Sequence, residues 1–436
     1  MVRNITIEGN ERTKVFVIER EILLKADKSY AIDSILSLIE LSENRVMNLN
    51  LFNQVSSSFN RDYDSLDLKF IVVEKWFDWP IPFLEFSDRN FNVWSNFQFD
   101  PERTNYGLYL FNYNVFGRNH TLKTSFVRGY NSSYGLEYRL PFISQESNWG
   151  IQGKAKYSSQ SEMWLNTEND KLQFYKNGNP DLIKRVEGEV SFSNRFDPFT
   201  TANIGFKSQQ INLDQSLDTL ATPYLLSSNN ELNVTEISAS IERDSRDNIY
   251  FPLQGFYLKP TIALQHFRGS ETFSNFYASY KIQHFAKLEN PRWYYALSLY
   301  GEINTDTFLP YEYTRRLGYD NLVRGFENYV VDGNNSFLVK SAIRYHLLDR
   351  SNLTFNFIPI KNYKVLPTNI FVEYFIDAGL INNKIPVKQN ELTNSLLMGT
   401  GLSFQLLLYN DRILRLDFSL NSKKEGGFFV HFTKAI

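Results

Sequence analysis

The 436-residue sequence contains no cysteine. This absence excludes a disulfide framework, a zinc site built on thiolates and a cysteine nucleophile. An excess of charge of one sign is also missing, since 46 basic and 48 acidic residues leave a net charge of −2. A near-neutral chain does not fit proteins whose main partner is nucleic acid, because those need a basic surface. No apolar run reaches the roughly 18 residues of a transmembrane helix, so the sequence predicts none.

Signatures of catalysis and of cofactor binding are missing as well. The sequence has no Gly-x-Ser-x-Gly nucleophile elbow and no phosphate-binding loop. Carboxylates are abundant, but nothing singles out an acid/base pair. We therefore expect a protein that is not an enzyme and that uses neither a cofactor nor a metal. The histidines are scattered and lack the spacing of a metal site: His120, His266, His284, His346 and His431.

Aromatic residues, in contrast, make up 16% of the chain, although its mean hydropathy is −0.36. This combination is unusual for a soluble α/β enzyme, in which Leu, Ala and Val usually dominate. No apolar stretch of a secretory signal follows Met1. The chain is therefore either cytosolic or numbered from after a removed leader, and the patterns below favour the second interpretation.

Residues 1–76 mix helical and strand periods. Gly9-Asn10 is a turn pair, and Thr13 is expected to cap the helix that follows. The β-α-α-β-β order predicts a small α+β domain near the lower size limit for independent stability. The expected elements are a strand near 2–7, helices over about 14–25 and 31–50, and strands near 54–60 and 66–74.

The pattern changes after Trp76, and residues 77–436 form a second expected domain. Trp79-Pro80-Ile81-Pro82 is expected to be a stiff extended joint, because proline fixes φ and biases its neighbour toward extended conformations. From there, apolar and polar residues alternate with a period of two, as over 370–380 and 413–420. Such alternation places one face of a strand in an apolar medium and the other in a polar one.

A soluble antiparallel sandwich and an antiparallel transmembrane barrel both show this alternation. Strands of about 9–11 residues and charges in the middle of the polar faces favour the barrel. Aromatic clusters near expected strand ends, at 293–295 and 311–313, suit its interfacial girdles. The chain length suggests roughly 14–18 strands, and since single-chain barrels are even-numbered we expect about 16.

Two motifs stand out within the expected barrel. Val323-Arg324-Gly325-Phe326 precedes an Asn/Gly-rich segment and, taken alone, fits an ordinary surface loop. In Phe375-Ile376-Asp377-Ala378-Gly379, alternation points Asp377 to the polar side. Taken alone, Asp377 fits a solvated lumen residue, but a carboxylate shielded from water needs a partner.

Together, about fifty residues apart, the two motifs resemble the BamA superfamily, barrel proteins that assemble or export polypeptides at outer membranes. In that family the arginine of an inward-folded loop binds the strand carboxylate inside the barrel. The resemblance thus implies a contact between Arg324 and Asp377. Glu373 shares the polar face, but four residues along a strand span about 13 Å. We therefore expect Arg324 to bind Asp377 well, and not both carboxylates. The motif positions beside this contact are Gly325, Phe326 and Gly379.

Three further segments carry the resemblance. Residues 1–76 resemble a single POTRA domain, with its Ile7-x-Gly9-Asn10 turn and its Leu51-Phe52-x-x-Val55 step. Asp244, Arg246 and Asp247 match the family's Asp-x-Arg-Asp turn. An ordinary polar hairpin explains this segment equally well. The closing strand of such barrels is matched by Gly427, Val430 and Phe432. A single POTRA-like domain leaves the subfamily open.

The resemblance implies an outer-membrane location in a Gram-negative-type cell, with the N-terminal domain in the periplasm. The expected partners are membrane lipid, unfolded client polypeptides and accessory lipoproteins. A client would add to an exposed strand edge and then to the barrel seam, between a first strand near 84–99 and a last strand near 427–433. Two alternatives stay open: a transporter dedicated to one secreted partner, and a passive porin-like channel.

Overall fold

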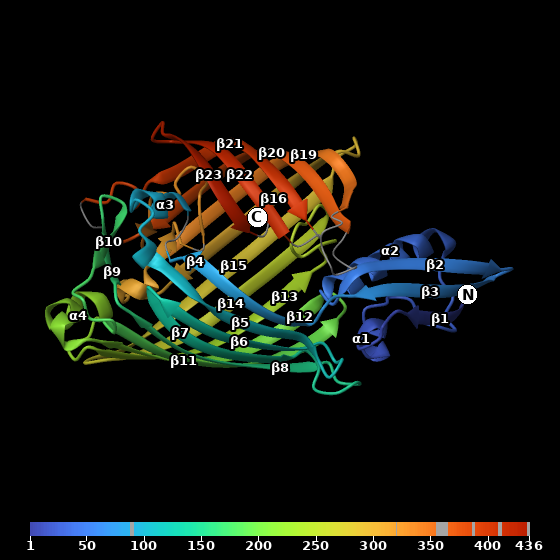
Figure 1. The fold of residues 1–436 in the computed structure, drawn as a ribbon, viewed down its shortest axis with the longest axis horizontal. Helices are drawn as coiled ribbons and strands as arrows, with labels where there is room; N and C mark the ends of the chain where they lie inside the picture. Colours follow the sequence, from blue (N-terminus) through green and yellow to red (C-terminus); the bar gives the residue numbers. More distant parts are fainter. Residues whose placement is uncertain (88–90, 320, 355–364, 386–388, 409–411, 434–436) are drawn as a thin grey trace.

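The structure is a computed structural model that describes the chain except for residues 88–90, 320, 355–364, 386–388, 409–411 and 434–436. It consists of a small N-terminal α+β unit and a large curved sheet (Figure 1). In the N-terminal unit β3 lies between β1, which it pairs in parallel, and β2, which it pairs antiparallel. The elements of this unit are β1 (Val2–Glu8), α1 (Val15–Glu19), α2 (Ile32–Asn48), β2 (Phe52–Asp62) and β3 (Ser65–Glu74).

The expected β-α-α-β-β order is confirmed, with two local differences. The first helix ends at Glu19 rather than near residue 25, although Ile22 and Leu24 remain buried in the core of this unit. Thr13 does not cap this helix, because the N-cap position is Lys14 and has no side-chain hydrogen bond. The Thr13 hydroxyl instead accepts a hydrogen bond of 2.8 Å from the Asn114 amide of the large sheet.

The expected count of 16 barrel strands is confirmed by one 16-stranded antiparallel sheet. Its strand order follows the chain, apart from short strands that lie in loops. The sixteen strands are β4 (Asp78–Phe86), β5 (Thr104–Val115), β6 (His120–Gly129), β7 (Asn131–Leu140), β8 (Trp149–Gln160), β11 (Ile183–Asp197), β12 (Thr200–Leu213), β13 (Glu231–Asp244), β14 (Gly255–Arg268), β15 (Thr272–Lys287), β16 (Trp293–Asn304), β19 (Asn335–Thr354), β20 (Val365–Asn382), β21 (Leu396–Leu408), β22 (Arg412–Asn421) and β23 (Gly426–Thr433).

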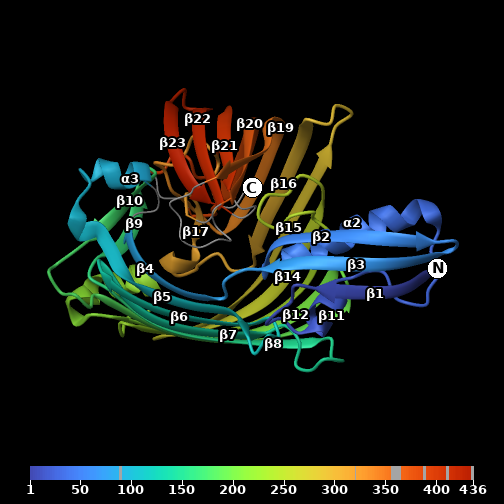
Figure 2. The ribbon, with the colours of Figure 1, turned by 45° about the vertical axis from the view of Figure 1, so that its right-hand side comes forward.

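The remaining elements lie in the connections between these strands. Figure 2 shows β17 within the curve of the large sheet, so at least one connection folds inward. Among the described residues, no helix is long and apolar enough to cross a membrane. The connecting elements are α3 (Phe91–Asn96), η1 (Pro101–Arg103), β9 (Met163–Glu168), β10 (Lys171–Tyr175), η2 (Gln215–Leu217), α4 (Asp218–Leu225), η3 (Tyr311–Tyr313), β17 (Arg315–Leu317) and β18 (Val331–Asp332).

The first barrel strand begins earlier than the sequence predicts. The segment expected as a joint, 79–82, lies inside β4, whereas residues 91–96, which were expected in the first strand, form the helix α3. Pro80 and Pro82 are tolerated in β4 because it is an edge strand of the sheet, where missing N–H donors need not break a ladder on both sides.

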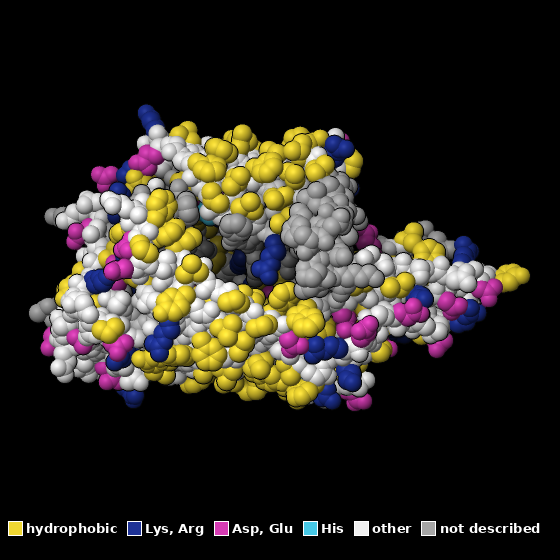
Figure 3. Space-filling model, in the orientation of Figure 1, with side chains coloured by type: hydrophobic (Ala, Val, Ile, Leu, Met, Phe, Trp, Pro, Cys, Tyr) yellow, Lys and Arg dark blue, Asp and Glu magenta, His cyan; other side chains and the backbone are white. Residues whose placement is uncertain are grey.

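The two faces of the sheet differ as alternation predicts. On β20, Tyr374 and Ile376 are exposed on the outer face, while Glu373, Phe375 and Asp377 are buried inside. Apolar side chains cover much of the outer surface around a central hollow in which basic side chains are visible (Figure 3). This arrangement suits a barrel whose outer face meets lipid and whose inner face meets water and inward-folded loops.

One predicted aromatic girdle is wrong. Tyr311 and Tyr313 belong to η3, where Tyr311 lies within hydrogen-bond distance of Thr167 and Tyr313 donates a bond of 2.7 Å to Gln209. Both rings pack against a cluster of buried apolar side chains inside the protein. Sequence clusters of Tyr therefore do not distinguish a lipid interface from an inward-folded loop, because both offer an apolar surface beside polar groups.

The N-terminal unit is attached to one end of the barrel by polar contacts. Arg45 on α2 donates to Glu21, and Arg195 of β11 donates to the same carboxylate at 2.5 and 2.8 Å. The Asn48 amide also donates at 3.3 Å to the carbonyl oxygens of Arg246 and Asp247, in the turn after β13. The unit therefore contacts the barrel both at the end of β11 and at the turn after β13.

Candidate functional site

The candidate site is built around Arg324, in a loop between β17 and β18 that we call the Arg324 loop (residues 321–330). The Arg324 side chain is 0% exposed, and so are Asp377 and Glu373 on the inner face of β20. A buried guanidinium is tolerated only when its charge and its N–H donors are satisfied. The partners of Arg324 therefore decide whether this loop is held inside the sheet.

Asp377 binds Arg324 through two parallel hydrogen bonds. The guanidinium Nε donates to Oδ2 at 2.8 Å, and Nη2 donates to Oδ1 at 2.7 Å. The backbone N–H of Arg324 also donates to Oδ2, at 3.2 Å. A bidentate contact fixes the orientation of the loop as well as its distance from the wall.

The expectation that Arg324 would bind only one carboxylate is wrong. Its Nη1 donates at 2.6 Å to Glu373, so both carboxylates bind the same guanidinium. The Arg324 guanidinium carbon lies 3.7 Å from the centre of the Phe375 ring, which lies between the two acids on the same face. Long side chains on either side of this ring converge on the guanidinium above it, although their Cα atoms are about 13 Å apart.

Sequence reasoning missed Arg344 as a member of this group. Arg344 lies opposite Glu373 in the β19–β20 ladder, and its Nε donates to Glu373 at 2.5 Å. Its Nη1 donates at 2.9 Å to the Pro252 carbonyl, in the β13–β14 connection. Alternation along β19 could have placed Arg344 on the inner face. Only the β19–β20 register, however, shows that Arg344 lies opposite Glu373. Arg324, Arg344, Glu373 and Asp377 are called the Arg324 cluster below.

Two glycines let the Arg324 loop approach the wall closely. A Cβ at Gly379 would lie 2.7 Å from Val323 Cγ2. A Cβ at Gly399 on β21 would lie only 1.7 Å from the Arg324 carbonyl oxygen, so no side chain fits there without moving the loop backbone. Gly399 was not identified from the sequence, because the residues around a single glycine in a strand do not show which other segment packs against it.

Gly325 and Phe326 complete the loop motif. Gly325 has φ +97°, a conformation that favours glycine. Its carbonyl accepts a hydrogen bond of 2.8 Å from Asn421 at the end of β22. Phe326 is buried against an apolar group that includes Val323 and Leu397. The loop is therefore held by apolar packing on one side and by ionic contacts on the other.

The Asp-x-Arg-Asp segment forms a compact turn after β13. Arg246 donates to the Asp244 carboxylate from Nε at 2.8 Å and from Nη2 at 2.5 Å, and its guanidinium carbon lies 4.4 Å from the centre of the Tyr257 ring. Asp247 Oδ1 accepts a hydrogen bond from the Leu253 N–H at 3.0 Å. Since Asn48 of the N-terminal unit contacts this turn and Pro252 follows it, the turn connects that unit to the Arg324 cluster through Arg344.

The closing strand β23 pairs only with β22 among the described residues. In this ladder Gly427 faces Ser419 and Val430 faces Leu416. Phe432 faces Leu414 in the backbone register, but its side chain lies outside the described part of the structure. At the other edge of the sheet β4 pairs with β5, and within the described residues no ladder joins β4 to β23. Within the described part of the chain, no backbone ladder therefore closes the seam between these strands.

A polar cavity of about 730 Å³ lies inside the sheet, away from the Arg324 cluster. It extends from Glu21 of the N-terminal unit to the inner faces of β11–β15, and Arg139, Glu189 and Lys259 are among its lining residues. The barrel interior therefore combines a wall packed against an inward loop with a wall that borders open space.

Comparisons with known families match both parts of the chain. Residues 114–427 match the Omp85 superfamily domain, and residues 1–75 match a POTRA domain described as a surface antigen variable number repeat. No curated protein matches the chain.

Solved structures agree with this assignment at the level of fold. The chain is similar to BamA from Haemophilus ducreyi lacking POTRA domains 1–3, with a TM-score of 0.53 and 14% identity over 99% of this chain and 82% of that chain. It is also similar to CdiB from Escherichia coli, with a TM-score of 0.56 and 11% identity over 99% of this chain and 75% of that chain. At such identities the likeness establishes the fold alone.

Proposed function

Because the chain belongs to the Omp85 superfamily, we propose that it inserts polypeptides into an outer membrane, or moves them across it, by pairing with their extended segments. Members of this superfamily are insertion or transport factors rather than enzymes. The N-terminal POTRA unit faces the periplasm in this proposal and receives the client first.

The seam, which no ladder of the described residues closes, carries the proposal. Within the described residues, β4 and β23 each lack a ladder on one side, and natural sheets usually blunt such edges because an unpaired edge recruits other strands. A client strand that adds to an edge gains main-chain hydrogen bonds without needing a particular sequence. The helix α3 contacts β23 at this seam and is placed to guide or restrict entry.

In this proposal the Arg324 cluster holds the Arg324 loop against the inner wall of the barrel, so that the lumen keeps one conformation. Its loop fixes β20 and β21 relative to β22 through contacts at Asp377, Gly399 and Asn421. The turn after β13 links the same cluster to the POTRA unit. Client binding at the periplasmic unit would therefore have a physical route to the lumen wall.

Site-specific photocrosslinking in living host cells tests the proposal. A photoreactive residue at Leu84, which is 76% exposed on β4, and one at exposed Ser58 on β2 should each capture client polypeptide. The matched control is Ile237, an exposed apolar residue on the outer face of β13 at 58% exposure, which should capture lipid but no client. Equal client capture at Leu84 and Ile237 would overturn the proposed seam route.

The identity of the captured polypeptides separates the candidate functions. Several different barrel proteins would indicate an assembly factor, and one secreted protein would indicate a dedicated transporter. Large steady single-channel conductance with no capture at Ser58 would indicate a porin-like channel instead.

Locking the seam provides a second test. The chain has no cysteine, so cysteine pairs can be scanned along β4 and β23 without background. A pair that forms a disulfide should abolish client insertion or export, and reduction should restore it. Full activity in the oxidised protein would exclude seam opening.

A further inference from the structure

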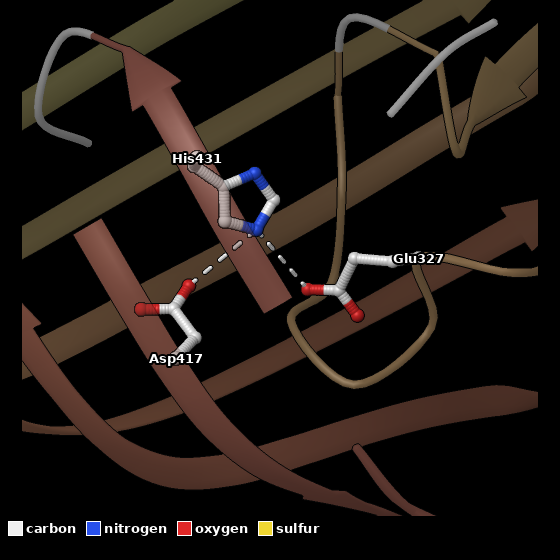
Figure 4. Close-up of side chains that lie close together, drawn as sticks. All are labelled: Glu327, Asp417 and His431. Atoms are coloured by element: carbon white, nitrogen blue, oxygen red, sulfur yellow. Dashed lines mark ion pairs between the residues drawn. The ribbon is translucent and has the colours of Figure 1, made fainter. Parts of the chain in front are cut away.

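Three side chains from three separate segments converge beside the Arg324 cluster, and we call them the His431 cluster. They are Glu327 from the Arg324 loop, Asp417 from β22 and His431 from β23 (Figure 4). His431 Nε2 lies 3.8 Å from Glu327 Oε1 and 3.7 Å from Asp417 Oδ2. The two carboxylates are 0% exposed and the imidazole side chain is 12% exposed.

These separations are too long for direct hydrogen bonds. Among the described residues, neither oxygen of Asp417 has a hydrogen-bond partner, and His431 Nε2 has none either. Arg415 Nε lies 2.9 Å from Asp417 Oδ2 without hydrogen-bond geometry. A fully buried carboxylate with an unsatisfied oxygen costs free energy unless another group occupies the space that it faces.

We propose that the His431 cluster binds one divalent transition-metal ion, with zinc the best match. Its potential donors are one imidazole nitrogen and two carboxylate oxygens, and the three atoms all lie within 4.8 Å of one another. Donor atoms placed tetrahedrally at about 2.0–2.2 Å from Zn²⁺ are roughly 3.3–3.6 Å apart, so small side-chain movements would complete the site. The imidazole favours zinc and similar ions over Mg²⁺ and Ca²⁺, which prefer oxygen ligands.

Charges of both signs surround the His431 cluster. Asp417 and Glu327 supply two negative charges, and Arg415 is the basic side chain paired with Asp417. The neighbouring Arg324 is already bound by Asp377 and Glu373. With His431 neutral, the two negative charges of the cluster face two basic side chains, Arg415 and Lys340 of β19, so an ion is indicated by the unsatisfied donor atoms rather than by net charge.

A metal ion here would join the inward loop to the seam. Glu327 lies three residues from Arg324, and His431 lies on β23, the edge strand beside the seam. The ion would therefore hold the side chain of His431 on the closing strand to the Arg324 loop, and its release would remove that link between the loop and β23. This site could not be predicted from the sequence, because its three residues are far apart in the chain and follow no ligand spacing.

The test uses the full-length protein folded in detergent micelles and stripped with a chelator. Calorimetric titration with Zn²⁺ should show one site per chain, and Co²⁺ should give the visible absorption of a tetrahedral complex. His431→Gln should weaken Zn²⁺ binding at least about 100-fold, since loss of an outer-shell group alone can cost 10–100-fold. Asp417→Asn should have the same effect.

His266→Gln is the matched control, because His266 is exposed and lies beside Ser274, away from the His431 cluster. Its binding should equal that of the unmodified chain. Heat-dependent gel mobility reports whether each variant is folded, and His431→Gln keeps a neutral side chain of similar size if Asp417→Asn does not fold. The absence of a Zn²⁺ site in the unmodified protein, or equal affinity in His431→Gln, would overturn the proposal and leave the space to water.

Discussion

Two walls of the same barrel use ionic groups in opposite ways. On β19, β20 and the Arg324 loop that covers them, the side chains of Arg324, Arg344, Glu373 and Asp377 are at most 1% exposed and bind one another. On β8, β11 and β12, Lys154 and Lys207 flank Glu187 at 2.8 and 3.4 Å, with side chains 35%, 36% and 15% exposed. The buried group depends on complete pairing, whereas the second can be hydrated when a partner is lost.

The comparison shows what an inward loop does to a barrel wall. The ion pairs under the Arg324 loop are sealed from water, whereas Lys154 and Lys207 remain partly exposed. Charges in the first group are therefore strongly coupled, and charges in the second group are weakly coupled. Substitutions of the same chemical kind should thus have very different effects on the two walls.

The largest effect is expected for Arg324→Met. This change leaves Asp377 and Glu373 buried with less charge compensation, so the docked loop should lose about 3–5 kcal/mol. Amide hydrogen exchange of residues 321–330 in the folded protein should rise accordingly. Lys154→Met is the matched change on the wall formed by β8, β11 and β12, and it should cost no more than about 1 kcal/mol. Similar losses for both would remove the distinction between the walls.

A smaller effect, about 1–3 kcal/mol, is expected for Gly399→Ala. The added methyl would meet the Arg324 carbonyl oxygen and push the loop away from β21. Gly153→Ala on β8 is its control, because a Cβ there has no atom within 4 Å. Chemical unfolding should separate the two variants, and equal stabilities would show that the loop is not seated against Gly399.

We expect cysteine substitutions on the outer face to differ from those beside the polar cavity in their rate of labelling by thiol reagents, while the stability of the protein is unchanged. Phe418→Cys lies at a position that is 58% exposed, and lipid should shield it there from water-soluble thiol reagents. Asn203→Cys, which borders the polar cavity, should react quickly. Rapid labelling at both positions in membranes would contradict a lipid-facing wall.

The smallest effect concerns an exposed pair on the POTRA unit. Hydrogen bonding from Arg3 lowers the pKa of the Asp67 carboxyl. The pair therefore stabilises the fold above the ordinary carboxyl pKa of about 4, and this contribution is lost as the pH falls through the lowered value. Asp67→Asn should speed hydrogen exchange in β1 slightly at pH 6, and the difference from the unmodified protein should vanish in acid. A difference that grows in acid would contradict this assignment.

The fold could be predicted because period-two alternation directly reports which face of a strand meets lipid. Asp377 was placed on the inner face for this reason. Gly399 and Arg344 could not be found, since their roles depend on which strands are neighbours and in what register. The contact of Arg324 with both carboxylates was missed because spacing along β20 ignores how long side chains converge over Phe375.

The boundaries were less predictable than the faces. Two prolines indicated a joint at 79–82, yet β4 includes them because an edge strand needs a ladder on one side only. The tyrosines of η3 looked like a membrane girdle, but they pack inside the protein. Local composition does not reveal whether a connection folds outward or into the lumen.

A double-mutant cycle on Arg324 and Asp377 tests the central claim most directly. The loop's docking free energy would be measured by hydrogen exchange in Arg324→Met, in Asp377→Leu and in the protein that carries both changes. If the two side chains share one buried contact, the loop of the double mutant should dock at least as stably as that of the less stable single mutant. The coupling free energy between the two changes should then reach up to about 3 kcal/mol. Costs that simply add, or a double mutant much worse than either single one, would contradict a loop held inside the barrel by this pair.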